Sequence, residues 1–215
     1  MPSRRRILAA VALCALFPGA TPLPALAQHK AAPLLVVGDS ISAAYGLPPG
    51  AGWVDLLALR LKERGYAQRV INASISGDTT AGGRARLPTL LAQHRPGIVI
   101  IELGGNDGLR GGDLKATREN LDTMVAAAAR EGAKVLLVGM RLPPNYGPGY
   151  TREFDALFGA VAAVRKVALL PYFFDGFGEK NDLFQPDRIH PTAAAQPLLL
   201  DNVWPRLEPM LGKPR

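Results

Sequence analysis

The sequence is poor in the residues that build disulfides and metal centres. Its 215 residues include one cysteine, Cys14, and three histidines. A single cysteine cannot form a disulfide within the chain, and no two histidines have the spacing of a zinc site. We therefore expect a protein that is held together by its hydrophobic core alone and that needs no metal and no cofactor.

The sequence also lacks an apolar run at its start that is long enough to cross a bilayer. The stretch from Ile7 to Phe17 has 11 residues, whereas a transmembrane helix needs about 20. Three arginines precede it, and small residues at positions 25 and 27 follow it, which is the order of a cleavable secretory signal. We expect residues 1–27 to be a signal peptide, of the twin-arginine or the general type, and residues 28–215 to be one periplasmic or secreted domain without a stable membrane anchor.

The basic charge does not indicate a nucleic-acid partner. The formal net charge is +7, and loss of the signal would remove three arginines and no acid. The remaining basic residues are scattered among acids, without a long basic run interleaved with aromatics. The glycine pair Gly104-Gly105 belongs to no phosphate-binding motif. We expect a monomer that binds neither nucleic acid nor nucleotide.

Short apolar segments alternate with helical ones along the chain. Continuous apolar runs bounded by Gly or Pro are typical of strands buried on both faces of a parallel sheet, and they occur at 34–37, 69–72, 98–101, 134–140 and 167–170. Helices are predicted at 53–64, 114–130, 151–165 and 192–211, the last bent at Pro197 and Pro205. This alternation predicts a three-layer α/β fold, in which ligands bind beyond the carboxyl ends of the strands.

The loops that follow the predicted strands contain the residues of a serine hydrolase. Ser40 follows the first strand, and Asp187 and His190 share one loop near the end of the chain. A serine hydroxyl needs a base to remove its proton and an acid to orient that base, so we predict Ser40 as nucleophile, His190 as base and Asp187 as acid. The simpler interpretation of Ser40 alone is a turn or helix-capping serine.

The same loops offer donors for an oxyanion hole. The backbone N–H groups of Ser40 and Gly77 and the side-chain amide of Asn106 each lie at the end of a different predicted strand. Asp39, Asp78 and Asp107 stand beside these residues, where aspartates usually bond to their own turn. His29 and His94 are the competing histidines, and we expect both to be solvated, His94 in a turn at 93–96.

These blocks, in this order, resemble those of the SGNH or GDSL-type hydrolase superfamily, and within it the thioesterase and arylesterase group. The similar stretches are 38–45, 70–80, 85–96, 102–111, 141–147 and 189–197. The resemblance implies a flavodoxin-like five-stranded sheet of order 2-1-3-4-5, a Ser-His-Asp triad and a three-donor oxyanion hole. One departure is Pro186-Asp187-Arg188, which stands where relatives often have a second acid and a glycine; the predicted triad is intact, but the charge beside it differs.

We expect residues beside these loops to contact the substrate: Ile41, Asp78, Leu109, Pro143, Asn145, Tyr146 and Ile189. The segment 141–147 is predicted as a wall of the acyl site or as a rigid connector. The favoured function is hydrolysis of small acyl esters and thioesters, such as lysophospholipids, acyl-CoA and aryl esters. Deacetylation of a carbohydrate or cell-wall polymer is the alternative, and an exported binding protein that has lost catalysis is the third possibility.

Overall fold

Five hydrophobic segments form one parallel sheet in the computed structural model, which describes residues 31–214. The predicted signal peptide, residues 1–27, and His29 lie outside the described residues. The strands are β1 (Leu34–Gly38), β2 (Val70–Asn72), β3 (Ile98–Glu102), β4 (Lys134–Val138) and β5 (Ala168–Leu170). They are hydrogen-bonded in the order β2-β1-β3-β4-β5, all parallel, as the family resemblance implied.

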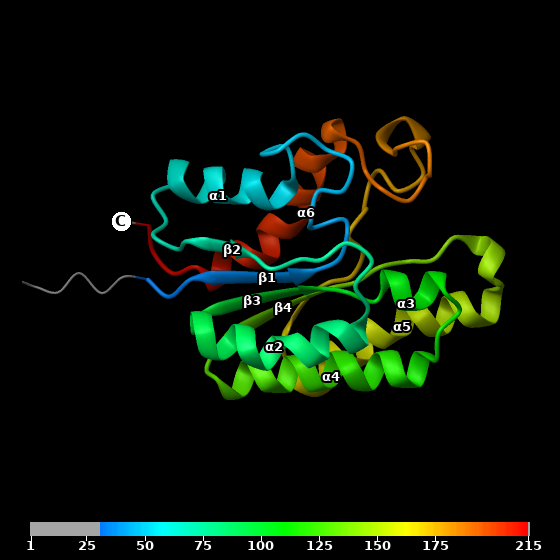
Figure 1. Cartoon of the computed structure of the whole chain (residues 1–215), viewed down its shortest axis with the longest axis horizontal. Coiled ribbons are helices and arrows are strands. Elements are labelled where there is room, and N and C mark those ends of the chain that lie inside the picture. The colour runs from blue at the N-terminus through cyan, green and yellow to red at the C-terminus, as the bar shows by residue number, and fades with distance from the viewer. Residues whose placement is uncertain (1–30, 215) are drawn as a thin grey trace, which may run out of the picture.

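Helices cover both faces of this sheet. They are α1 (Trp53–Glu63), α2 (Thr80–His94), α3 (Gly105–Leu109), α4 (Leu114–Arg130), α5 (Pro148–Arg165) and α6 (Gln196–Leu207). In Figure 1, α1 and α6 lie on one side of the sheet and α2 to α5 on the other, which makes three layers. Single turns of 3-10 helix occur at Pro144–Tyr146, Asn181–Leu183, Ala193–Ala195 and Glu208–Met210.

The core lies between these layers. Every residue of β1 and β3 is buried, because helices cover the two central strands on both faces. Large side chains fill the space on either side, with Trp53 of α1 packed edge to face against Phe173 and Phe154 of α5 against Phe158. The rigid sheet therefore brings the carboxyl ends of β1, β2 and β3 to one edge of the molecule.

Two helices were absent from the sequence prediction. Helix α2 carries Gly82, Gly83 and Pro88, which interrupt the apolar period that marks a helix. The glycine at 83 is required by packing, because a Cβ there would clash with Leu103 and Met124. Helix α3 has only five residues, too few for any periodicity. The predicted turn at 93–96 is wrong in part, since α2 continues to His94.

The last predicted helix is divided in the structure. A 3-10 turn precedes α6 and another follows it, so that the predicted helix at 192–211 consists of three consecutive pieces. Pro197 does not bend the helix but stands in its first turn, where a missing N–H costs no hydrogen bond. Among residues 31–214, no helix combines the length and the hydropathy that crossing a bilayer requires.

Candidate active site

The turn after β1 places the hydroxyl of Ser40 at the edge of the sheet. Gly38 is the last residue of β1, and the chain then turns tightly, with the N–H of Ala43 donating to Asp39 O at 2.9 Å. The carboxylate of Asp39 accepts a further hydrogen bond from the N–H of Ile41 at 3.0 Å. These contacts hold Ser40 at the tip of the turn, where it is only 9% exposed.

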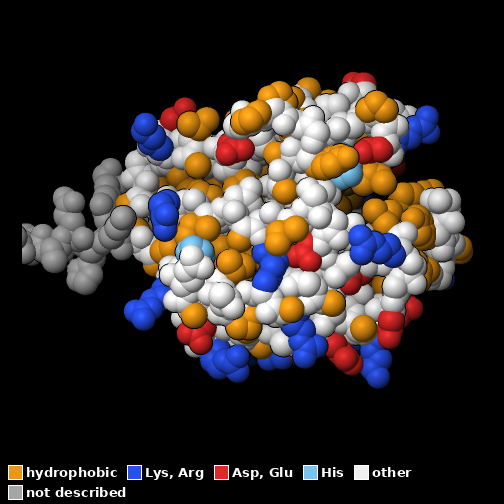
Figure 2. All heavy atoms as spheres, in the orientation of Figure 1, with side chains coloured by type: hydrophobic (Ala, Val, Ile, Leu, Met, Phe, Trp, Pro, Cys, Tyr) orange, Lys and Arg blue, Asp and Glu red, His pale blue; other side chains and the backbone are white. Residues whose placement is uncertain are grey.

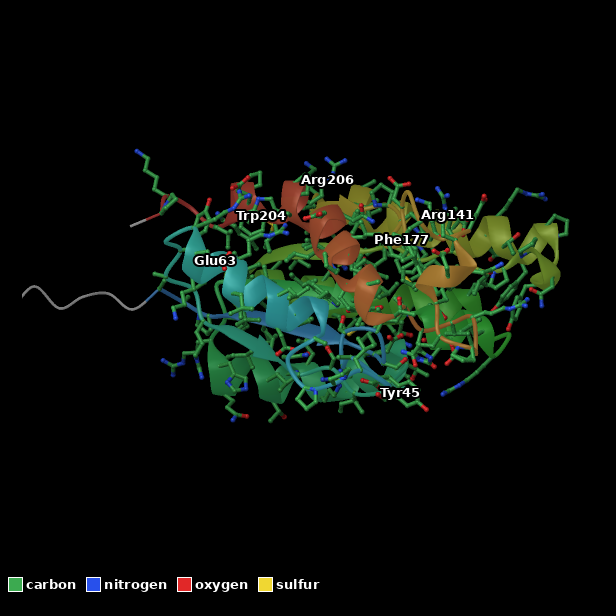
Figure 3. The ribbon with its side chains drawn as sticks, turned by 90° about the horizontal axis from the view of Figure 1, so that it is seen from above. Tyr45, Glu63, Arg141, Phe177, Trp204 and Arg206 are labelled. Carbon is green, nitrogen blue, oxygen red and sulfur yellow. The ribbon has the colours of Figure 1, made fainter. Side chains whose placement is uncertain are left out.

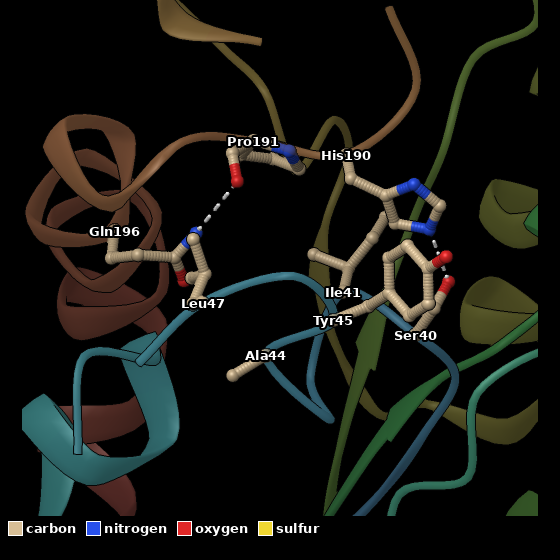
Figure 4. Close-up of a pocket in the computed structure, with 8 residues that line it drawn as sticks. All are labelled: Ser40, Ile41, Ala44, Tyr45, Leu47, His190, Pro191 and Gln196. Carbon is tan, nitrogen blue, oxygen red and sulfur yellow. Dashed lines mark hydrogen bonds between the residues drawn. The ribbon is translucent and has the colours of Figure 1, made fainter. Parts of the chain in front are cut away.

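The loop near the C-terminus brings the predicted base and acid to this serine. His190 Nε2 lies 2.8 Å from Ser40 Oγ, and His190 Nδ1 lies 2.7 Å from Asp187 Oδ2. The ring of Tyr45 lies against the imidazole, with 4.6 Å between ring centroids (Figure 4). Three side chains that are up to 150 residues apart in the sequence thus form a continuous hydrogen-bonded chain.

The 187–190 loop is a tight turn that orients its own side chains. Asp187 Oδ1 accepts the N–H groups of Ile189 and His190 at 2.9 and 3.0 Å. Arg188 adopts the left-handed conformation, with φ of 59°, which costs a residue with a Cβ about 1 kcal/mol. Glycine, which has no Cβ, would adopt the same conformation without this cost.

Hydrogen bonding keeps the acid of this chain ionised. Burial alone would raise the pKa of Asp187, but the N–H groups of His190 and Ile189 and the imidazole together lower that pKa below its usual value. An ionised carboxylate at this position accepts the Nδ1 proton of His190, which leaves Nε2 free to take a proton from Ser40.

The three residues that the sequence predicts as oxyanion donors, Ser40, Gly77 and Asn106, line one cavity. The side-chain amide of Asn106, in α3, donates one of its two protons to Asp39 Oδ2 at 3.1 Å, which leaves the other for a ligand. Within residues 31–214, the backbone N–H groups of Ser40 and Gly77 donate to no acceptor. Gly77 has a φ of 78°, in the region that favours glycine. That these three groups act together as an oxyanion hole stays a prediction.

Two buried acids lie beneath the serine turn. Asp39 is 2% exposed, and burial raises its pKa to about 6, against the opposing effects of the Ile41 N–H and of His190. Glu102, the last residue of β3, is fully buried, and burial together with the nearby Asp39 carboxylate raises its pKa well above the usual value. Its Oε2 accepts the hydroxyl of Ser42 at 2.7 Å and the N–H of Asp39 at 3.4 Å.

A cavity of about 1350 Å³ opens directly above the serine. Ser40, Asn106 and His190 lie along it, and much of the remaining wall is apolar. The surface is hollowed and bordered by hydrophobic side chains in Figure 2. Figure 3 labels three of the lining residues, Tyr45, Arg141 and Phe177, all in the right half of the view. No group of three or more metal-ligating side chains occurs within the described part of the chain.

Comparison with known proteins assigns this arrangement to a family. Residues 36–197 match the GDSL-like lipase/acylhydrolase family. The chain belongs to this family. It is 57% identical to "Esterase TesA" of Pseudomonas aeruginosa over 91% of this chain and 98% of that protein. It is 41% identical to "Thioesterase 1/protease 1/lysophospholipase L1" of Escherichia coli, over 83% and 85% of the two chains.

A solved structure agrees with the same assignment. The crystal structure titled TesA superposes with a TM-score of 0.81 at 60% identity and covers 83% of this chain and 99% of its own. The protein is therefore a carboxylic ester hydrolase with the α/β fold of the GDSL family.

Of the seven residues that the sequence predicted as substrate contacts, four line the cavity of this GDSL hydrolase: Ile41, Leu109, Pro143 and Ile189. Asp78 does not line it, because its carboxylate turns away toward Arg86 and the N–H of Thr79. Asn145 and Tyr146 also lie outside the lining. The Tyr146 hydroxyl instead donates to Leu109 O at 2.8 Å, so the 141–147 segment is part wall and part connector.

Sequence reasoning overlooked several residues that shape the site. Met140 and Tyr45 line the cavity, and Glu102 supports the serine turn from below. Asp107 accepts from the N–H of Thr80 at 2.9 Å, which ties α3 to the start of α2 rather than to its own turn. A signal existed for Glu102, because an acid that ends an otherwise apolar strand must find buried partners.

Proposed function

We propose that this protein hydrolyses acyl esters and thioesters through an acyl-enzyme on Ser40. The observation that supports the proposal most directly is the chain of contacts from Asp187 through His190 to Ser40 Oγ, with lengths of 2.7 and 2.8 Å. These lengths are within hydrogen-bond reach for proton transfer before any substrate binds.

The contacts assign a role to each group. His190 Nε2 removes the proton of Ser40 as Oγ attacks the carbonyl carbon, and Asp187 stabilises the resulting imidazolium. The carbonyl oxygen becomes an oxyanion that accepts from the N–H groups of Ser40 and Gly77 and from Asn106 Nδ2. Collapse of this intermediate expels the alcohol or thiol, which takes the proton from His190. Water then attacks the acyl-enzyme by the same steps and regenerates Ser40.

The walls of the cavity support a hydrophobic acyl group as the part of the substrate that is bound. Three segments of the chain contribute apolar side chains to the cavity wall, and these side chains are Leu109, Met140, Leu142 and Phe177. Burial of apolar area stabilises a bound acyl chain by about 25 cal/mol per Å². The relatives of this chain include an esterase, an arylesterase and a thioesterase, which supports ester and thioester substrates alike.

A panel of substrates tests this function. Rates with p-nitrophenyl esters of increasing chain length, an acyl-CoA thioester and an acetylated polysaccharide are to be compared for the wild type and the Ser40→Ala variant. We expect the wild type to turn over the esters and the thioester, and the Ser40→Ala variant to have lost this activity. The control variant His94→Ala, which replaces the last residue of α2, should keep it. Turnover of the acetylated polymer alone would identify a deacetylase, and no turnover of any substrate would contradict the proposal.

Export of the protein is part of the same proposal. The three arginines, the apolar stretch and the small residues that end at position 27 support a cleavable signal and a periplasmic or secreted enzyme. N-terminal sequencing of the enzyme recovered from the periplasmic fraction tests it. A chain that begins at Gln28 is the expected result, and an uncleaved chain confined to the cytoplasm would contradict it.

A further inference from the structure

An arginine outside the triad joins the two loops that carry the proposed backbone donors. Arg86 lies in α2, and its side chain is 20% exposed. Its guanidinium donates through Nη2 to Gly38 O at 3.3 Å, through Nη1 to Ala73 O, and through Nε to Asp78 Oδ2 at 2.8 Å. These acceptors end β1, follow β2 and follow Gly77, respectively. One planar cation therefore contacts both loops of the oxyanion hole.

The turn that contains Gly77 is closed at both ends by these contacts. Ile75 N donates to Gly38 O at 3.0 Å, so the loop after β2 begins against the residue that precedes the Asp39-Ser40 turn. Asp78 N donates to Ile75 O at 3.1 Å, and the Asp78 carboxylate then extends to Arg86. The direction of the Gly77 N–H relative to Ser40 is therefore determined by where Asp78 and Gly38 are held.

The first turn of α2 leaves room for this carboxylate. A Cβ at Gly82 would clash with Asp78 Oδ1, so only glycine allows the acid to lie against the helix. Asp78 is 11% exposed, whereas the surface pair Arg64 and Glu208 is 52% and 41% exposed. Ion pairs shielded from water are screened less by salt and hold their geometry better than exposed ones.

We propose that Arg86 is a positioning residue that keeps the N–H groups of Ser40 and Gly77 aligned on one oxyanion. The inference rests on the proposed function, because it assumes that these two groups are oxyanion donors. The proposal assigns a role to residues 85–96, a stretch that resembles the family's sequences but contributes no residue to the triad. Arginine suits this role because its rigid fork presents five donors in one plane, whereas lysine is a compact point charge on a flexible stem, without a fixed donor plane.

The variants Arg86→Ala, Arg86→Lys and Asp78→Asn test the role, with Arg84→Ala as the matched control. Arg84 lies on the same helix, and its guanidinium donates to Asn120 Oδ1 of α4 at 3.1 Å. Turnover of a p-nitrophenyl ester is measured per active site titrated with a fluorophosphonate, well below each variant's Tm. This normalisation separates a slower site from a smaller folded fraction.

We expect Arg86→Ala to lower kcat at least about tenfold while KM stays within about threefold, because misplacement by a fraction of an ångström acts on the transition state. Arg86→Lys retains the charge beside Asp78 and should recover part of the loss. Asp78→Asn should lower kcat in the same direction, and Arg84→Ala should match the wild type. If Arg86→Ala does not fold, Arg86→Lys and Asp78→Asn decide the question.

The inference is wrong if kcat per titrated site is unchanged in the Arg86 variants, if only KM rises, or if Arg84→Ala loses as much. Failure of the proposed function looks different. In that case the wild type itself shows no turnover, or the fluorophosphonate labels a residue other than Ser40.

Discussion

Replacing Asp39 with asparagine separates its effect on catalysis from its effect on stability. Asp39 Oδ2 accepts a proton from Asn106 Nδ2 at 3.1 Å, while Oδ1 accepts from Ile41 N at 3.0 Å. In Asp39→Asn the new Oδ1 can retain the bond to Ile41, which leaves the new amide NH₂ facing the NH₂ of Asn106. Two donors cannot bond to each other. The Asn106 amide must therefore either rotate, so that its oxygen faces the new NH₂ group at position 39, or move away from it.

Either response removes a donor from the proposed oxyanion hole. Loss of one such donor costs about 2.7–4 kcal/mol in transition-state stabilisation, which lowers kcat by about 10²- to 10³-fold. KM should change little, because the full charge on the oxygen exists only in the transition state.

The same substitution should change how stability depends on pH. Burial raises the pKa of Asp39 from 3.8 to about 6, so the folded protein binds this proton more tightly than the unfolded chain does. The contribution of Asp39 to the free energy of unfolding of the wild type therefore decreases as pH rises from about 4 to about 6, by about 3 kcal/mol in total. Asparagine does not titrate, so the free energy of unfolding of the variant relative to the wild type should rise over that interval.

Urea unfolding at pH 4, 5, 6 and 7 measures this difference, and steady-state kinetics with a p-nitrophenyl ester measures kcat. Asp55→Asn, at an exposed position of α1, is the control. A stability difference that stays constant from pH 4 to pH 7 would refute the argument from burial. Unchanged kcat in Asp39→Asn would refute the orientation of Asn106 by Asp39.

Three further results are expected from the proposed mechanism. A fluorophosphonate should form one adduct, at Ser40, and peptide mapping that placed it on Ser42 or Ser76 would overturn the nucleophile assignment. Asn106→Ala should lower kcat by about 10²- to 10³-fold with KM within a few-fold, whereas a rise in KM alone would make Asn106 a loop residue. Prolonged dialysis against EDTA should leave esterase activity unchanged. If EDTA abolished the activity and added zinc restored it, the enzyme would require a metal.

The pattern of apolar runs was sufficient to predict the sheet and most of the helices. Strands buried on both faces are continuous in hydrophobicity, so β1 and β3 were recognisable from the sequence, and α4 was predicted with its observed bounds. Helix α2 was missed because its glycines serve contacts made elsewhere in the fold, against Leu103 and against Asp78. Such residues follow tertiary packing and carry no local helical signal.

The sequence by itself was enough to predict the chemistry of the candidate site, since Ser40, Gly77, Asn106 and His190 each lie in a short local motif. Tertiary structure alone decided how the backbone holds them. The contacts of Glu102 with the serine turn, of Asp39 with Asn106 and of Arg86 with two loops join residues from 8 to 67 positions apart. The sheet brings these residues together because its parallel strands end at one edge, and no local pattern records which side chains meet there.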